Sequence, residues 1–287
     1  MSATAQEAGT FTLGGDMEVR RMGYGAMRIT GEGIWGPPAD HDQSIAVLRR
    51  AVELGANLID TADSYGPEVS ENLIAEALHP YPDDLVIATK GGLTRAGPGD
   101  WERDCRPGRV KTCCEDSLRR LKLDQIDLYQ LHAVDPKLPY DEQVGALADL
   151  KAAGKIRHAG VCNVGRRELE QARAIVDVVS VQNRYSIVDR SASKVLAVCE
   201  RDGLGFLPWF PLGAGDLGED AAQTLDEVAA AHEASRFQVA LAWLLQSSPV
   251  QLPIPGTSSV EHLEENIAAA AIRLTDEEMQ KLDELGS

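Results

Sequence analysis

Short apolar runs and amphipathic stretches alternate along most of the 287-residue chain. In the first amphipathic stretch, Ile45, Leu48 and Val52 share one face while Arg49 and Glu53 point away from it, which predicts a helix. Further helices are predicted near 71–78, 108–121, 141–153, 166–175, 190–202, 221–246 (broken near 233–235) and 260–270. We interpret the apolar runs as strands at 23–27, 58–60, 85–90, 126–131, 158–162, 178–182, 205–209 and 250–254.

This alternation indicates the fold. Continuously apolar strands are buried on both faces, and strands that alternate with helices form a parallel sheet. Eight strand–helix units in about 250 residues match the length of a (β/α)8 barrel, so the predicted fold class is α/β. A β-hairpin over 11–13 and 17–21, with Gly14-Gly15 as its turn, precedes the barrel, and an extra C-terminal helix begins with a capping box from Thr275 to Glu278. No break in composition divides the chain, which predicts one domain over 1–287.

Charge and cysteine content narrow the classes of partner. The 45 acidic residues outnumber the 28 basic ones, and the net charge of −17 argues against binding to nucleic acid or to an anionic membrane surface. The five cysteines are odd in number and lack the spacing of metal ligands, so we expect free thiols, no metal site and a cytoplasmic location. No signal peptide and no apolar run of 18 residues is present, which predicts a soluble protein. We expect a monomer or a weak homo-oligomer.

Polar residues follow the predicted strands at corresponding positions. Asp60 ends the second strand, Lys90 the third, and His132, Asn163 and Gln182 follow the next three. Each has an ordinary explanation, because Asp60 could cap a turn, Lys90 could be a solvated loop residue and His132 an interior hydrogen-bonded histidine. In a barrel, however, all of these strand ends meet on the face where active sites are built.

Four residues at these ends form a coherent acid–base set: Asp60, Tyr65, Lys90 and His132. A free tyrosine has a pKa of about 10, and a buried ammonium nearby favours the phenolate. Lowering that pKa by about two units requires roughly 3 kcal/mol, which we expect Lys90 to supply with Asp60 as its counter-charge. His132 would orient the substrate oxygen or share the proton. The set predicts proton transfer to or from an oxygen, without a nucleophile.

The chain resembles the aldo-keto reductase superfamily over essentially its whole length. The resemblance is carried by G-A-N-L-I-D-T-A-D-S-Y-G (55–66), I-A-T-K (87–90), Y-Q-L-H (129–132), G-V-C-N (160–163), V-Q-N-R-Y (181–185), P-W-F-P-L-G (208–213) and I-P-G-T-S-S-V-E-H-L-E-E-N (254–266). Within the superfamily, T-F-T-L-G-G, G-Y-G-A-M, the W-G-P-P loop and F-P-L-G are similar to the bacterial pyridoxal reductase branch.

The resemblance implies a reductase that transfers hydride from NADPH to an aldehyde or ketone and yields the alcohol, with pyridoxal reduced to pyridoxine as one such reaction. Tyr65 would be the proton donor, Lys90 and Asp60 its tuning pair, and His132 the orienting residue. Trp35, Trp101 and Tyr185 are expected around the substrate. The implied cofactor site comprises Gly25, Ala26, Met27, Asp60, Cys162, Asn163, Gln182, Trp209, Phe210, Pro211, Leu212, Gly213, Thr257, Ser258, Ser259, His262, Glu265 and Asn266.

The chain departs from the family pattern at the cofactor. Cys162 stands where many members have Ser, and Trp209 where many have Tyr. Gly256 and His262 occupy positions that often carry Lys and Arg for the 2′-phosphate of NADP. A capping box from Ser258 to Glu261 would still offer free N–H groups to an anion. NADP is therefore expected, with NAD open.

Two other interpretations are weighed. The run Gly213 to Gly218 fits G-x-G-x-x-G, but too little parallel sheet follows for a Rossmann fold. The alternative function is a cofactor-binding sensor or regulator on the same fold, like the potassium-channel β subunits.

Overall fold

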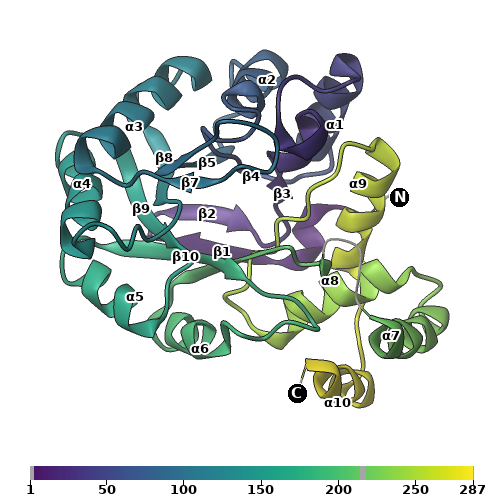
Figure 1. The fold of residues 1–287 in the computed structure, drawn as a ribbon. Coiled ribbons are helices and arrows are strands. Elements are labelled where there is room, and N and C mark those ends of the chain that lie inside the picture. The colour runs from purple at the N-terminus through teal and green to yellow at the C-terminus, as the bar shows by residue number, and fades with distance from the viewer. Residues whose placement is uncertain (1–2, 214–217, 287) are drawn as a thin grey trace.

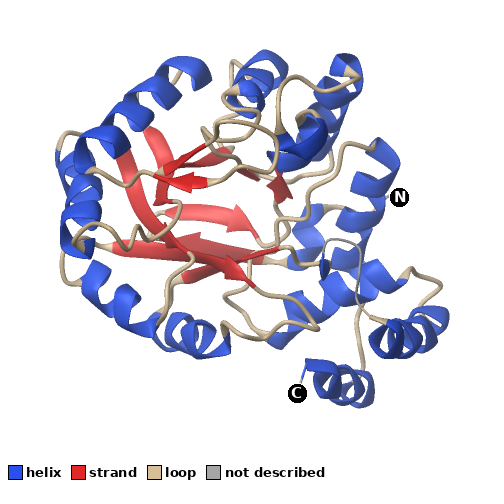
Figure 2. Cartoon of the chain, in the orientation of Figure 1, coloured by secondary structure: helices blue, strands red, loops and turns tan. Residues whose placement is uncertain are grey.

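The computed structural model describes residues 3–213 and 218–286, and its centre is one parallel sheet. The seven strands are hydrogen-bonded in the order β11-β10-β9-β8-β5-β4-β3. The sheet curls, and helices cover its outer side (Figures 1 and 2). The strands are β3 (Tyr24–Gly25), β4 (Leu58–Asp60), β5 (Val86–Gly91), β8 (Ile126–Leu131), β9 (Ile156–Cys162), β10 (Val178–Arg184) and β11 (Gly205–Trp209).

Helices follow the strands as the periodicity predicts. The predicted break near 233–235 is confirmed, because α7 ends at Ala231 and α8 begins at Arg236. Ser235 caps α8 by accepting a hydrogen bond from the backbone N–H of Gln238. The helices are α1 (His41–Glu53), α2 (Val69–Leu78), α3 (Pro107–Leu121), α4 (Tyr140–Ala152), α5 (Arg166–Arg173), α6 (Ser193–Asp202), α7 (Glu219–Ala231), α8 (Arg236–Ser247), α9 (Val260–Ala268) and α10 (Asp276–Asp283).

The eighth predicted strand, over 250–254, is not a strand in the described residues. The segment still joins both edges of the sheet: the backbone N–H of Leu252 donates to Phe206 O of β11 at 2.8 Å, and that of Gly23, just before β3, donates to Pro253 O at 3.0 Å. Pro253 and Pro255 have no N–H group, which prevents a regular ladder. The segment therefore closes the ring of strands without being counted among them.

A hairpin covers the end of the ring opposite the strands' carboxyl ends. β1 (Thr10–Leu13) and β2 (Met17–Arg20) pair antiparallel, and their apolar side chains pack on barrel residues such as Leu58 and Leu207. Gly14 has φ of 62°, and a Cβ there would clash with the ring of His158. His158 in turn lies 2.6 Å from a carboxylate oxygen of Asp16. These contacts fix the hairpin, shown in purple in Figure 1, across the barrel.

Two further elements bear on function. A second hairpin, β6 (Leu93–Thr94) with β7 (Glu102–Arg103), extends beyond the carboxyl end of β5. The C-terminal helix α10 packs outside the barrel against α7 and α8, where the indole N–H of Trp243 donates to Asp283 at 2.8 Å. The carboxyl ends of the strands are thus left as the face on which side chains and loops gather.

Candidate active site

Lys90 is the most completely buried charge at the carboxyl ends of the strands. The side chain, in β5, is fully buried, and its ammonium donates to Asp60 Oδ1 at 2.6 Å and to the carbonyl of Thr61 at 2.7 Å. Burial, the largest single effect, lowers the pKa of Lys90, but Asp60 together with Tyr65 and Cys162 outweighs it and holds that pKa above the usual range. Lys90 is therefore an ammonium ion whose position is fixed by the end of β4.

The hydroxyl of Tyr65 lies 3.4 Å from this ammonium. Burial raises the pKa of Tyr65 to about 12, although the charge of Lys90 pulls it down. The expected lowering of this pKa is therefore wrong, because removing a phenolate from water costs more than the charge of Lys90, opposed by that of Asp60, returns. Tyr65 keeps its proton at neutral pH and can donate it.

His132 lies beside Tyr65, with the two rings edge to face at 5.9 Å between centroids. Burial and then the charge of Lys90 hold the pKa of His132 well below its usual value, so the imidazole is neutral. Its Nδ1 lies 3.4 Å from the hydroxyl of Ser64, and its backbone N–H donates to Gly91 O at 2.9 Å. A neutral, fixed ring favours orienting a substrate oxygen over sharing the proton.

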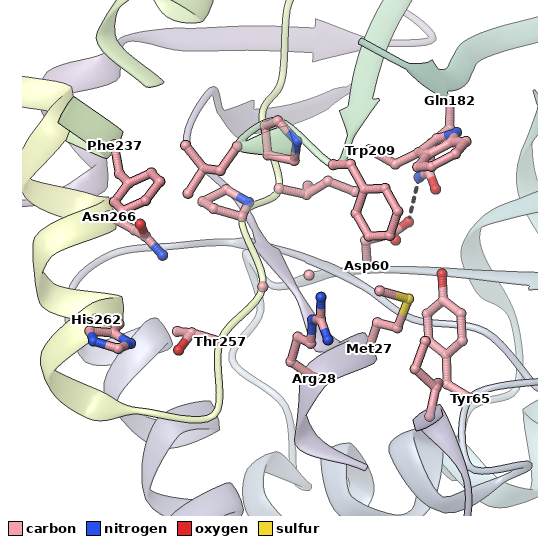
Figure 3. Close-up of a pocket in the computed structure, with 18 of the residues that line it drawn as sticks. Met27, Arg28, Asp60, Tyr65, Gln182, Trp209, Phe237, Thr257, His262 and Asn266 are labelled. Carbon is pink, nitrogen blue, oxygen red and sulfur yellow. Dashed lines mark hydrogen bonds between the residues drawn. The ribbon is translucent and has the colours of Figure 1, made fainter. Parts of the chain in front are cut away.

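The amides at the neighbouring strand ends bind to this centre. Gln182 donates to Asp60 Oδ2 at 2.8 Å (Figure 3), in addition to the bond from Lys90. Asn163 donates to the backbone carbonyl of His132 at 2.9 Å, and its own oxygen accepts from the indole N–H of Trp209 at 3.0 Å. The predicted strand-end residues are thus brought together in one hydrogen-bonded network.

The network forms one end of a long pocket of about 790 Å³. Figure 3 shows Tyr65 and Gln182 toward one end and His262, Asn266 and Phe237 toward the other. Fourteen of the residues expected at the cofactor or the substrate line this pocket. They are Gly25, Met27, Asp60, Asn163, Gln182, Trp209, Phe210, Pro211, Leu212, Thr257, His262, Glu265 and Asn266 of the cofactor set, and Trp101 of the substrate set.

Five residues expected at the cofactor are not among the lining residues. Ala26 and Cys162 are buried, and the charges of Lys90 and Asp60 act on the Cys162 thiol. Ser259 is the N-cap of α9 and accepts from the backbone N–H of His262, so the predicted capping box from Ser258 is displaced by one residue. Ser258 is exposed outside the pocket, and Gly213 closes a turn by donating to Phe210 O. Of the glycine-rich run that begins there, residues 214–217 lie outside the described part of the chain.

Two residues expected at the substrate are elsewhere. Tyr185 is buried in the core, edge to face with Phe206 and stacked on Trp243 of α8 at 6.3 Å. Successive side chains alternate along a strand, so with Gln182 facing the barrel interior, Tyr185 faces the helices. Trp35 does not line the pocket, and the centroid of its ring lies 5.8 Å from the guanidinium carbon of Arg95.

Sequence reasoning missed several lining residues. Arg28, in the 3-10 helix Ala26–Ile29, is an exposed cation beside Gly256, and its position one residue after Met27 was a usable signal. Phe237 opens α8 and carried no signal of its own. Gly256, considered for the 2′-phosphate, also lines the pocket, and the residues missed are Arg28, Ile34, Leu93, Ser235, Phe237, Ile254 and Pro255.

Within 3–213 and 218–286, no group of three or more His, Cys, Asp or Glu side chains is placed to hold a metal ion. Among the helices of the same residues, none has the length and apolar character needed to span a membrane. The five cysteines are all buried and unpaired.

Comparisons with known proteins agree with this geometry. A family model described as "Aldo/keto reductase family" matches residues 21–287. An uncharacterized oxidoreductase of Schizosaccharomyces pombe is 51% identical over 282 residues, 98% of this chain and 91% of that protein. Pyridoxine 4-dehydrogenase of Escherichia coli is 43% identical over 280 residues, 96% and 97% of the two chains. The crystal structure of an aldo-keto reductase from Klebsiella pneumoniae in complex with NADPH superposes with a TM-score of 0.81 at 28% identity, covering 99% of this chain and 95% of that one.

Proposed function

The chain belongs to the aldo/keto reductase family of oxidoreductases, and from that premise we propose that it reduces an aldehyde or ketone to the alcohol with NADPH. One observation carries the proposal. The phenol of Tyr65, protonated at neutral pH, lies 3.4 Å from a buried ammonium at one end of a pocket about 790 Å³ in volume. We propose further that 1–287 acts as one (β/α)8 domain, as a cytoplasmic monomer or weak homo-oligomer.

The residues of the pocket fit a nicotinamide dinucleotide. At the Tyr65 end, Asn163 and Gln182 offer amides for the carboxamide group, and Trp209 offers an aromatic face for the ring. The pocket is elongated, as such a cofactor requires, and its other end is lined by Thr257, His262 and Asn266 with Arg28 nearby. When bound, the cofactor supplies the hydride.

Tyr65 supplies the proton. The carbonyl oxygen of the substrate would accept hydrogen bonds from the phenol of Tyr65 and from His132, which polarises the carbonyl carbon toward hydride. As the oxygen gains negative charge, the phenolic proton moves to it and the alcohol forms. The phenolate left behind is stabilised by Lys90 and is reprotonated from water. Asp60 holds Lys90 in place through the whole cycle.

NADPH is preferred over NADH on two grounds. The Klebsiella pneumoniae relative was crystallised with NADPH. Arg28 and His262 both line the pocket and can donate hydrogen bonds to a phosphate, and both side chains are exposed. NADH remains the second candidate because the Lys and Arg of the family pattern are replaced here by Gly256 and His262.

The substrate we propose is a flat aromatic aldehyde, with pyridoxal as the first to test. Trp101 lines the pocket edge to face with Tyr65, at 6.4 Å between ring centroids, so an aromatic ring can pack beside the reacting carbonyl. The Escherichia coli relative named for pyridoxine oxidation, 43% identical, supports the same chemistry.

NADPH absorbance tests the proposal. Purified protein with pyridoxal or 4-nitrobenzaldehyde should oxidise NADPH and form the matching alcohol. If a broad aldehyde panel gives no oxidation while NADPH still binds, the enzyme proposal fails and the sensor alternative is favoured.

A further inference from the structure

Two loops beside the Tyr65 end of the pocket meet at one guanidinium. Arg95 follows β6 and donates to the carbonyls of Gly33 at 2.9 Å and Ile34 at 3.0 Å in the loop after β3. It also donates to the carbonyls of Asp100 at 2.9 Å and Gly97 at 3.3 Å within its own loop. A planar guanidinium offers five N–H groups in a fixed fork, so one side chain can hold both loops.

The loop that Arg95 holds ends in Trp101. Residues 95–101 connect β6 to β7, and this connection contains two glycines, Gly97 and Gly99, which alone would leave it many conformations. The Arg95 guanidinium carbon lies 3.8 Å from the centroid of the Trp101 ring. Arg95 thus fixes the loop backbone and also stacks on the indole that the loop carries.

Trp101 is the part of this arrangement that faces the chemistry. Its ring is edge to face with Tyr65 and with His132, at 6.4 and 6.5 Å between centroids, and it lines the pocket. The indole is nevertheless 37% exposed, and within the described residues its ring contacts are those with Tyr65, His132 and Arg95. Of these three contacts, Arg95 is the one that also binds the backbone of the loop that carries Trp101.

We propose that Arg95 is a positioning residue that holds Trp101 as the substrate-facing wall and thereby sets the preference for flat aromatic carbonyls over aliphatic ones. The inference rests on the proposed reductase function and deepens it at the same site. Arg95 does not touch the reacting atoms; it acts through Trp101.

The kinetic test compares 4-nitrobenzaldehyde with butanal in wild type, Arg95→Ala, Trp101→Ala and the double variant. Arg95→Ala should raise KM for the aromatic aldehyde about fivefold, the scale of one lost aromatic contact, with kcat and the KM for butanal within about twofold of wild type. The double variant should match Trp101→Ala, because the two residues act through one contact. Arg95→Lys should not restore selectivity, since an ammonium lacks the fork.

Arg190→Ala is the matched control. Arg190 also stacks on a tryptophan, Trp243, at 4.5 Å, and donates to the carbonyls of Leu282 and Asp283, but it does not line the pocket. Its removal should leave the ratio of the two KM values unchanged. Equal selectivity in Arg95→Ala and wild type, or additive losses in the double variant, would overturn the inference.

A second readout does not need turnover. The fluorescence of Trp101 is the part of the emission that is lost in Trp101→Phe. Acrylamide should quench this fluorescence more strongly in Arg95→Gln than in wild type, at equal thermal stability. Unchanged quenching contradicts the clamp. If wild type oxidises no NADPH with any aldehyde, the proposed function fails on its own, and the quenching result still decides whether Arg95 holds Trp101.

Discussion

The two ends of the pocket are built differently. Around Tyr65, the side chains of Lys90 and Asp60 are buried and each makes several hydrogen bonds to the protein. At the α9 end, His262 and Arg28 are exposed and lie on a helix start and a short 3-10 turn. Under the proposed function, the residues for proton transfer are therefore fixed by the fold, whereas those proposed for cofactor selectivity are surface side chains that can be exchanged without disturbing the core.

Tyr65→Phe should have the largest effect, because it removes the proton donor and leaves the aromatic ring. We expect kcat to fall by about 10²- to 10⁴-fold, the usual worth of general acid catalysis, with NADPH affinity near wild type. Steady-state rates and fluorescence titration measure the two quantities. Tyr140→Phe is the control, since the buried Tyr140 hydroxyl has no hydrogen-bond partner among the described residues. Substantial reductase activity in Tyr65→Phe would refute the assigned role.

Lys90→Met tests whether the fixed end is also structurally essential. It leaves the carboxylate of Asp60 buried without its cation, which should cost about 3–5 kcal/mol in the free energy of unfolding. Lys111→Met breaks a pair of the same 2.6 Å length with Asp149, but that pair is exposed and should contribute less than about 1 kcal/mol. Urea denaturation of both variants checks the difference, and similar losses would mean that Lys90 and Asp60 are not a buried pair.

Asp63→Asn tests whether a buried carboxyl near Tyr65 destabilises the folded protein when it ionises. Burial raises the pKa of Asp63 to about 7, partly opposed by a hydrogen bond with Cys113, and raised further by Glu71 against the pull of Arg120 and Arg109. Its Oδ1 has no partner in the described residues. Because the folded-state pKa is raised, the folded protein binds more protons, and ionised Asp63 destabilises it increasingly as pH rises from about 4 to 7.

The variant should therefore be more stable than wild type by about 4 kcal/mol at pH 8, with the advantage disappearing below about pH 4. Thermal unfolding across this range measures it. A pH-independent difference between the two proteins would show that the Asp63 carboxyl is not the cause.

His262→Arg should have the smallest effect and act at the exchangeable end. A guanidinium beside the 2′-phosphate should tighten NADPH by about tenfold with little change for NADH, the worth of one charge-assisted contact. His41→Arg, at the start of α1 and away from the pocket, controls for added positive charge. Equal tightening of both cofactors would place residue 262 away from the 2′-phosphate.

The same contrast explains what the sequence could predict. Apolar runs and strand-end polar residues are local signals, so seven strands and the convergence of Asp60, Lys90 and His132 followed from them. The segment 250–254 was apolar enough for a strand, but Pro253 and Pro255 interrupt its hydrogen bonding. Tyr185 was misplaced because its direction depends on strand register, which no local pattern gives.

The remaining misses depend on tertiary structure. The direction of the Tyr65 pKa shift follows from a balance between burial and two opposed charges, and that balance appears only in three dimensions. Arg95 was an ordinary loop arginine in the sequence, because its four carbonyl partners lie on two loops separated by about sixty residues. Phe237 reaches the pocket only because α8 begins there.

The proposed reaction adds a hydride from NADPH and a proton from Tyr65 to an aldehyde. Its most direct test measures NADPH consumed and alcohol formed in the same reaction, with pyridoxal and 4-nitrobenzaldehyde as substrates and wild type beside Tyr65→Phe. The account predicts one alcohol per NADPH with wild type and almost none with the variant. Bound NADPH that is never oxidised, or equal product from both proteins, would contradict it.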